Sequence, residues 1–482
     1  MARKLLALLP VFALAAVACV GEQGDDADEN VGVDEGAVMD RGTPRGAKTV
    51  HFPMTNGAPD EICVLPNHLS MADYDKDDLE SEQELCSYSF HGAAPREADV
   101  QKTDVAICPK LSSTNPGTDI HELLPGKSKA ETEAAICKLQ DRPTKHLAKY
   151  KQSITCSYTP SILGYYHLSR LLGGAGDVKP AVVRTMGLPE HKAVVSNALN
   201  ILRNQGDGEY PKVSWLSFQK AESNPSATPK KDALYTQDLL QIYGGLQENA
   251  RGESRYSEIN KRGAAPNPAG PFTRTAQWAS VASGKPMSQI AGRTLKDSAQ
   301  TVQVVKDISE MLVMDYLMSQ QDRFGNIHEI DYYYSLDAKG EVEKVKKSKV
   351  DDGEKPMPAN AVLVKKMILK DNDCGGSTKD NVVKKAGLID QMRHMSPNLY
   401  ANIQWLAANF AAGTEVPKFL TVEALFAQAD INMLRTNLAE LGPKLKSMCT
   451  SGKLMLDADL EDHLAGKGHD PAACNAIEAP KH

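Results

Sequence analysis

Two acidic segments in the second half of the chain carry the residue types best suited to catalysis or metal binding. The first, residues 315–326, contains Asp322 followed by Arg323, and the second, residues 367–373, ends in Asp371-Asn372-Asp373. Each segment comes at the end of a regular element expected from its hydrophobic pattern, a helix for the first and a strand for the second. Loop carboxylates positioned by a rigid scaffold can converge on one ligand. Taken alone, either segment is better explained as an ion pair or a polar turn, because short motifs recur by chance.

A lysine-bearing segment in the first half could serve the same chemistry. Residues 147–151 read Leu-Ala-Lys-Tyr-Lys, which places Lys149 and Lys151 on one face of an expected strand. An ammonium group on such a strand can hold phosphate oxygens. Lys149 by itself could also be a solvated strand lysine.

The hydrophobic pattern indicates the elements that must position these residues. Short β-like segments between turn signals, at 105–108, 119–123, 134–137 and 146–150, predict an antiparallel sheet. Helices are predicted over 161–172 and from 301 to about 319, with a shorter helical piece at 233–243. A strand pair at 330–336 and 361–369 and then mostly helices complete the chain.

The order and spacing of these pieces resemble the catalytic core of the atypical kinases. That group includes the type II phosphatidylinositol 4-kinases, the HipA-like bacterial kinases and the secretory-pathway kinases that phosphorylate casein-like proteins and proteoglycan sugars. The matching pieces are residues 147–151, 166–173, 178–184, 315–326 and 367–373. The resemblance is discontinuous and runs from about 118 to 410.

This resemblance implies an α+β, two-lobed atypical protein-kinase-like fold, with an antiparallel β N-lobe and a mainly helical C-lobe. It implies that Lys149 holds the nucleotide phosphates, with Lys151 as a further nucleotide-binding residue, and that Asp322 orients the acceptor hydroxyl. Asp371 and Asn326 would bind the metal, with Asp373 competing for the role of Asp371. Hard oxygen ligands suit Mg²⁺ or Mn²⁺, so the implied cofactor is Mg²⁺ or Mn²⁺ with ATP.

Three positions depart from the family pattern. Ile327 stands where the metal-binding Asn or acid is usual, with Asn326 before it and His328 after it. Ser161 and Ile162 occupy the stretch where a helix Glu would pair with the strand lysine, and Asp373 replaces a usual Gly. The alternative to an active kinase is therefore a catalytically inactive, pseudokinase-like binding or scaffold protein.

The N-terminus predicts export and lipid attachment. Arg3 and Lys4 precede an apolar run that ends in small residues before Cys19, and the run is shorter than the roughly 20 residues that span a bilayer. Residues 16–19 resemble the bacterial lipobox, although Ala16 stands where Leu is usual, so plain secretory cleavage near Ala18 is the alternative. We expect a lipoprotein of the bacterial cell envelope, anchored in a membrane and facing the periplasm or the exterior.

The remaining cysteines and the charge constrain the partners. Nine cysteines less Cys19 leave eight, an even number that favours disulfides in an exported chain, with the pairing left open. The formal net charge of -7 without a basic domain argues against nucleic acid. The expected partners are thus the membrane through the lipid, a nucleotide, and a protein or glycan acceptor.

The predicted organisation has six parts. They are a signal peptide and lipobox at 1–19, an acidic tether at 20–48, an N-terminal extension at 49–103, a kinase-like N-lobe at 104–204, an insert or lid at 205–300, and a kinase-like C-lobe at 301–482.

Replacing the lipidation residue tests the anchor. Cys19→Ser should release the protein from membranes without unfolding it, because the acidic tether separates the lipid from the folded part. Membrane fractionation in high salt, together with a thermal melt, provides the measurement. A variant that stays in the membrane fraction would show that the signal segment itself is the anchor.

Overall fold

The computed structural model describes residues 46–55, 57–206, 208–376, 380–411 and 413–475. The predicted signal peptide, its Cys19 and nearly all of the acidic tether lie outside the described residues.

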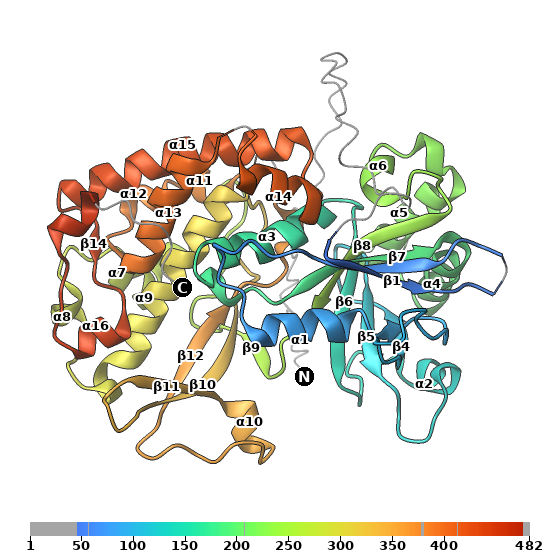
Figure 1. Ribbon diagram of the computed structural model, residues 1–482, viewed down its shortest axis with the longest axis horizontal. Coiled ribbons are helices and arrows are strands. Elements are labelled where there is room, and N and C mark those ends of the chain that lie inside the picture. Colours follow the sequence, from blue (N-terminus) through green and yellow to red (C-terminus); the bar gives the residue numbers. More distant parts are fainter. Residues whose placement is uncertain (1–45, 56, 207, 377–379, 412, 476–482) are drawn as a thin grey trace, which may run out of the picture.

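One part of the protein is built on an eight-stranded sheet (Figure 1). In spatial order its strands are β1 (Lys48–Phe52), β2 (Glu61–Leu65), β7 (Ala181–Gly187), β8 (Gln241–Glu248), β6 (His146–Gln152), β5 (Thr118–Glu122), β4 (Thr103–Pro109) and β3 (Tyr88–Ser89). All neighbouring pairs are antiparallel except β3 and β4. The predicted antiparallel sheet is therefore present, and it is larger than the sequence indicated.

Helices cover both faces of this sheet. They are α1 (Lys76–Leu85), α2 (Lys129–Ile136), α3 (Thr159–Leu171), α4 (Leu188–Ile201), α5 (Tyr210–Ser223) and α6 (Lys231–Leu234). Every residue of α3 is buried, because this helix lies between the sheet and the helical part of the molecule. The strand predicted at 134–137 is wrong: Ser128 and Glu131 form a capping box that starts α2 there.

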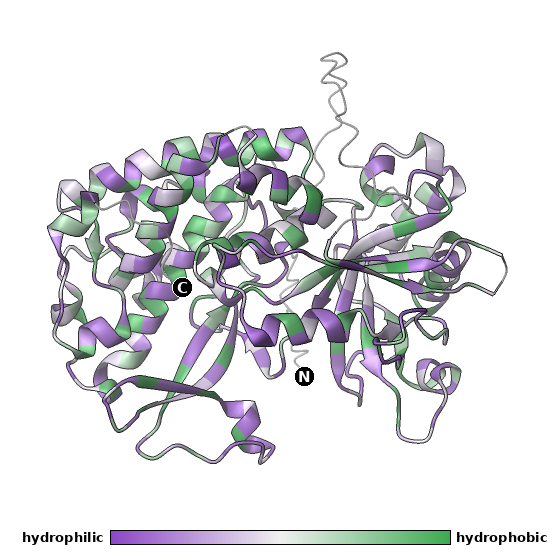
Figure 2. Ribbon diagram, viewed as in Figure 1, coloured by the Kyte–Doolittle hydropathy of each residue, from purple (hydrophilic) through white to green (hydrophobic). Residues whose placement is uncertain are grey.

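The other part of the protein is mainly helical and surrounds α9 (Leu295–Leu317). The further helices are α7 (Ala276–Val281), α8 (Met287–Ile290), α11 (Val382–Lys385), α12 (Leu388–Gln391), α13 (Pro397–Asn409), α14 (Glu415–Glu423), α15 (Gln428–Thr450) and α16 (Leu460–Leu464). The short helix α10 (Lys347–Asp351) lies beside β10 and β11 instead. Figure 2 shows hydrophobic and hydrophilic residues alternating around these helices, as expected when one face packs on a core. None of the helices in the described ranges is long and apolar enough to cross a membrane.

A smaller sheet lies beside α9. Its strands are β11 (Val342–Lys346), β10 (His328–Leu336) and β12 (Val362–Ile368), and β9 (Glu253–Arg255) also pairs with β10. The strand pair predicted at 330–336 and 361–369 is confirmed, since β10 and β12 are antiparallel neighbours. A third, two-stranded sheet joins β13 (His394–Met395) to β14 (Met455–Leu456). The protein is therefore a mixed helix and strand protein.

Residues 205–300, predicted to be an insert or lid, are distributed over several elements. β8 lies in the middle of the large sheet, between β7 and β6. α7 packs against α9. Residues near 260 contact the acidic segment that follows α9, where the Asn260 Oδ1 accepts a hydrogen bond from the Ile327 backbone N–H at 2.9 Å.

The eight cysteines that the structure describes form four disulfides. The pairs are Cys63–Cys86, Cys108–Cys137, Cys156–Cys374 and Cys449–Cys474. The prediction of disulfides is confirmed, and the structure supplies the pairing. Cys156–Cys374 joins the segment between β6 and α3 to the residue that directly follows the second acidic segment.

Candidate functional site

A pocket lies where the large sheet meets the acidic segment after β12. Its volume is about 450 Å³, including the part open to solvent. The lining comes from β6, α3, the residues just before β7, β8, the connection from β8 to β9, the first residue of β9, and residues 368–373. The lining side chains that carry chemistry are Lys149, Lys151, Lys179, Gln247, Glu248, Asn249, Glu253, Lys370, Asp371, Asn372 and Asp373.

Lys151 joins the two carboxylates of the second acidic segment. Its Nζ donates to Asp373 Oδ1 at 2.8 Å and to Asp371 Oδ1 at 3.3 Å. Lys151 and Asp373 are almost fully buried, whereas the Asp371 side chain is 24% exposed and faces the pocket. The three residues form one charged group at the end of the pocket.

The charges in this group shift each other's pKa values. Burial alone would lower the pKa of Lys151, but the Asp373 and Asp371 carboxylates raise it above its ordinary value. Burial would likewise raise the pKa of Asp371, yet Lys151 and Lys149 hold it well below its usual range. The lysine is therefore charged and Asp371 is ionised at neutral pH.

The backbone of the second acidic segment is fixed by two hydrogen bonds from the start of α3. The Asp373 carbonyl accepts a hydrogen bond from the Tyr158 N–H at 2.8 Å, and the Asn372 carbonyl accepts one from Ser161 Oγ at 2.6 Å. Asp371 has a left-handed backbone, with φ of 53°. Such a conformation is uncommon for residues other than glycine and persists only where the surroundings enforce it.

Arg323 connects the two acidic segments. Its guanidinium donates to both carboxylate oxygens of Asp315, at 2.8 and 2.9 Å, and to Asn372 Oδ1 and the Lys370 carbonyl, each at 2.7 Å. Tyr165 of α3 adds a third donor to Asp315 at 2.7 Å. Both charged side chains have no exposed surface. This network links the end of α9, the first acidic segment and the second one.

Asp322 lies on the first acidic segment, next to this network. Its Oδ1 accepts a hydrogen bond from Arg262 at 2.7 Å, and Asn326 Nδ2 donates to its backbone carbonyl at 3.0 Å and to its Oδ2 at 3.3 Å. Burial raises the pKa of Asp322, and the charges of Asp373 and Asp371 add to that effect. Asp322 is thus close enough to the other two aspartates for their charges to interact.

The structure brings most of the predicted site residues together. Lys149, Lys151, Asp371 and Asp373 line one pocket. Asn326 contacts Asp322, not Asp371. His328, the residue on the other side of Ile327, lies closer to the second segment, with Nε2 4.0 Å from Asp371 Oδ2.

Sequence reasoning missed several residues that lie in or near the pocket. Lys110 follows β4 and lies close enough to interact electrostatically with Lys151, Asp371 and Lys149. Glu253 forms an ion pair with Lys370, and Asn249 lies just after β8. No short motif marks these residues, because their proximity to the site depends on strand order in the large sheet.

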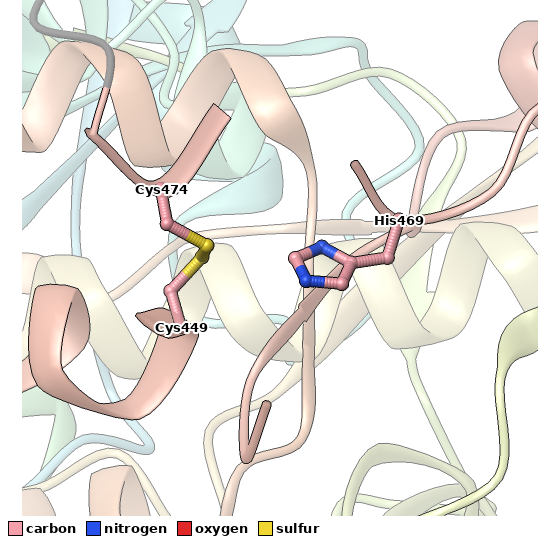
Figure 3. Close-up of side chains that lie close together, drawn as sticks. All are labelled: Cys449, His469 and Cys474. Carbon is pink, nitrogen blue, oxygen red and sulfur yellow. A yellow bond between two sulfur atoms is a disulfide. The ribbon is translucent and has the colours of Figure 1, made fainter. Parts of the chain in front are cut away.

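Among the residues that the structure describes, two other groups of side chains have the types that bind metals. In the first, the sulfurs of Cys449 and Cys474 are joined in a disulfide and His469 lies beside them, so neither sulfur is a thiolate ligand (Figure 3). In the second, Asp119 accepts a hydrogen bond from Arg142 at 2.7 Å, and Arg142 also lies 3.2 Å from His121 Nε2. A guanidinium between these ligands disfavours a second cation there.

Comparison with known proteins gives no assignment. No protein-family model matches the chain, and the search of curated proteins finds no similar protein.

The Arg323 network makes a strong prediction about stability. Asp315→Asn should remove the charge that compensates a fully buried guanidinium and should lower the free energy of unfolding by about 3–5 kcal/mol. Urea denaturation followed by circular dichroism measures the change. The variant Asp390→Asn, which affects a surface ion pair with Lys444, should change stability by less than about 1 kcal/mol. Equal effects of the two substitutions would contradict a central role for Arg323.

Proposed function

We propose that this protein is a lipid-anchored phosphotransferase of the bacterial cell envelope, resembling the atypical kinases, that transfers the γ-phosphate of ATP to a hydroxyl of a protein or glycan. The observation that supports this most directly is Lys151 between Asp371 and Asp373 at the end of a pocket. A lysine and carboxylates in one pocket suit a metal-bound phosphate chain.

The arrangement of the elements supports the proposal. A strand carries the lysines, a buried helix follows it, and the acidic segments come after α9 and β12. The large sheet would then be the N-lobe and the helical part the C-lobe of a kinase-like fold. The four disulfides are compatible with an extracytoplasmic location.

The residues at the Lys151 end of the pocket fit a divalent cation. Asp373 Oδ2 is buried and has no hydrogen-bond partner among the described residues, and Asp371 faces the pocket. Carboxylate oxygens of this kind are the ligands that Mg²⁺ and Mn²⁺ prefer. When bound, the ion would neutralise charge on the transferred phosphate.

Further cations are available for the phosphates. Lys151 and Lys370 form ion pairs with carboxylates, but Lys149 forms none with any residue that the structure describes. Lys110 adds a charge from the β4–β5 connection. Lys149, which lines the pocket, can therefore contact an anionic ligand without breaking an ion pair.

In this proposal Asp322 accepts a hydrogen bond from the acceptor hydroxyl and takes its proton. The hydroxyl oxygen forms a bond to the γ-phosphorus while the bond from that phosphorus to the bridging oxygen breaks, and ADP leaves. The raised pKa of Asp322 makes it a better proton acceptor than an exposed carboxylate. Arg262, whose side chain is 47% exposed, would have to move for a hydroxyl to reach Asp322.

A binding or scaffold protein that does not transfer phosphate is the second candidate. Two observations favour it: Arg262 already pairs with Asp322, and Asn326 contacts Asp322 instead of Asp371. Such a protein would keep the nucleotide and metal site and lack transfer.

Two aspartate variants separate these candidates. Nucleotide at 100 times its dissociation constant should stabilise the wild type by about 2.7 kcal/mol, which raises the melting temperature by about 2–4 °C. Asp371→Ala should lose this Mn²⁺/ATP-dependent shift together with transfer, whereas Asp322→Ala should keep most of the shift and lose transfer. Thermal melts and transfer from labelled ATP provide the measurements. A wild type that shows the shift without transfer supports the scaffold candidate, and no shift at all would end the kinase proposal.

The lowered pKa of Lys110 predicts that phosphate binding depends on pH. Burial and the nearby charge of Lys151 lower the pKa of Lys110 to about 8. Its positive charge, and the affinity it contributes, should be present below pH 8 and lost as the pH rises through 8. Calorimetric titration with inorganic tripolyphosphate and Mn²⁺ measures this. Lys110→Arg should bind with little pH dependence across this range, and a wild type equally insensitive to pH would exclude Lys110 from the site.

A further inference from the structure

One of the four disulfides differs from the others in its access to solvent. Cys156 is partly exposed, whereas the other seven disulfide-bonded cysteines of the described ranges are each at most 2% exposed. Exchange of a disulfide begins when an external thiolate attacks one of its sulfur atoms, so access helps to decide which disulfide reacts. Among the disulfides that the structure describes, Cys156–Cys374 is therefore the one open to attack, and the attack comes at Cys156.

The side chain of Asn115 places a donor against both sulfur atoms of this disulfide. Its Oδ1 accepts a hydrogen bond from Thr155 Oγ1 at 2.6 Å, and its Nδ2 lies 3.2 Å from Cys156 Sγ and 3.4 Å from Cys374 Sγ. Lys230 Nζ, which donates to the Thr155 carbonyl at 2.8 Å, adds a positive charge nearby. An N–H donor and a cation beside a sulfur atom stabilise a thiolate. The surroundings therefore favour the charged sulfur that forms when the disulfide opens.

The backbone directly before Cys156 is strained. Thr155 has a φ of 55°, in the left-handed region that a β-branched residue rarely adopts. Among the described residues with a positive φ, it is the only β-branched one. Such a conformation persists only where the surroundings enforce it. The disulfide at the next residue is one such constraint, so its opening allows Thr155 to relax.

The other end of the disulfide anchors the second acidic segment, since Cys374 directly follows Asp373. Three backbone hydrogen bonds hold the same stretch independently of the disulfide. Their donors, the reporter amides, are the N–H groups of Tyr158, Gln321 and Gly376, which lie 2.8, 3.3 and 2.7 Å from the carbonyls of Asp373, Cys374 and Met318. Because these bonds do not involve sulfur, we expect the reduced protein to stay folded. It loses only the covalent anchor of the segment that carries Asp371 and Asp373.

We propose that Cys156–Cys374 is a redox-active disulfide that exchanges with an external dithiol, and that its reduction loosens the second acidic segment. A thiolate of the dithiol attacks Cys156 Sγ, the bond between the two Sγ atoms breaks, and Cys374 leaves as a thiolate that takes up a proton. The second thiol of the dithiol then attacks the external sulfur of the mixed disulfide and releases Cys156, which is protonated in turn. The protein disulfide gains two electrons and two protons, and the dithiol is oxidised to a disulfide. This inference is independent of the proposed function, because it needs no nucleotide or metal.

Partial reduction followed by mass spectrometry identifies the reactive disulfide. The full-length protein is titrated with dithiothreitol under native conditions, the free thiols are alkylated, and the labelled peptides are mapped. Cys156 and Cys374 should be alkylated at a dithiothreitol concentration at least about tenfold lower than any other pair, with the circular dichroism spectrum retained. If another pair is reduced first, or if all four pairs are reduced together, the proposal is wrong.

Two glycine variants test the role of Thr155. Thr155→Gly removes the strain, because glycine adopts the left-handed region freely, so half-reduction should require about fivefold more dithiothreitol. Asn360→Gly is the matched control, since Asn360 is also exposed and has a φ of 54° but belongs to the connection from β11 to β12. It should be reduced like the wild type. Equal behaviour of the two variants would exclude a role for Thr155 in the exchange.

Hydrogen exchange measures the loosening of the second acidic segment. The reporter amides should exchange several-fold faster in the reduced than in the oxidised protein, whereas the amide of Met455 in β14 should not change. The double variant Cys156→Ser/Cys374→Ser should show the fast exchange with and without dithiothreitol. Cys449→Ser/Cys474→Ser, which lacks a disulfide of the helical part, is the control and should respond to reduction like the wild type. Reporter amides that exchange equally before and after reduction would overturn the loosening.

Discussion

The buried pair of Arg323 and Asp315 is the interaction on which the candidate site depends. A charged guanidinium without exposed surface is tolerated only when its donors are satisfied, and Arg323 satisfies them with Asp315, Asn372 and the Lys370 carbonyl. These partners belong to the end of α9 and to the segment after β12. Arg323, which does not line the pocket, therefore helps to hold Asp322 and Asp371 in position relative to each other.

Lys151 completes this arrangement from the large sheet. Its ion pairs with Asp371 and Asp373 cross from β6 to the segment after β12, and the Cys156–Cys374 disulfide crosses at nearly the same place. The pocket is therefore bounded by elements that are fixed to each other by a charge contact and a covalent bond. This suits a site whose chemistry requires positioning more than reactive side chains.

Local patterns in the sequence predicted the parts of the site that lie within one element, and failed where packing decides. The segment 147–151 and both acidic segments could be recognised from the sequence. α2 could also have been predicted, since Ser128 and Glu131 have the sequence pattern of a capping box. β8 could not be predicted from the sequence, because Gly244 and Gly245 weaken the pattern of a strand. Tertiary structure explains the glycine at position 244, because a Cβ atom there would lie 2.3 Å from the Lys151 carbonyl oxygen. Asn249 lines the pocket, and Lys110 lies near it, only because of the strand register, which no local pattern encodes.

The Cys156–Cys374 disulfide also has a topological consequence. It closes a covalent ring whose ends are 218 residues apart in the sequence, and this ring contains β7 to β12 and α9. A ring of that size reduces the entropy of the unfolded chain by an amount equivalent to about 5 kcal/mol. A single proteolytic cut in the exposed stretch at 351–357, inside the ring, would leave the two fragments covalently joined. Proteolysis there would nick the protein without separating Lys151 from Asp371.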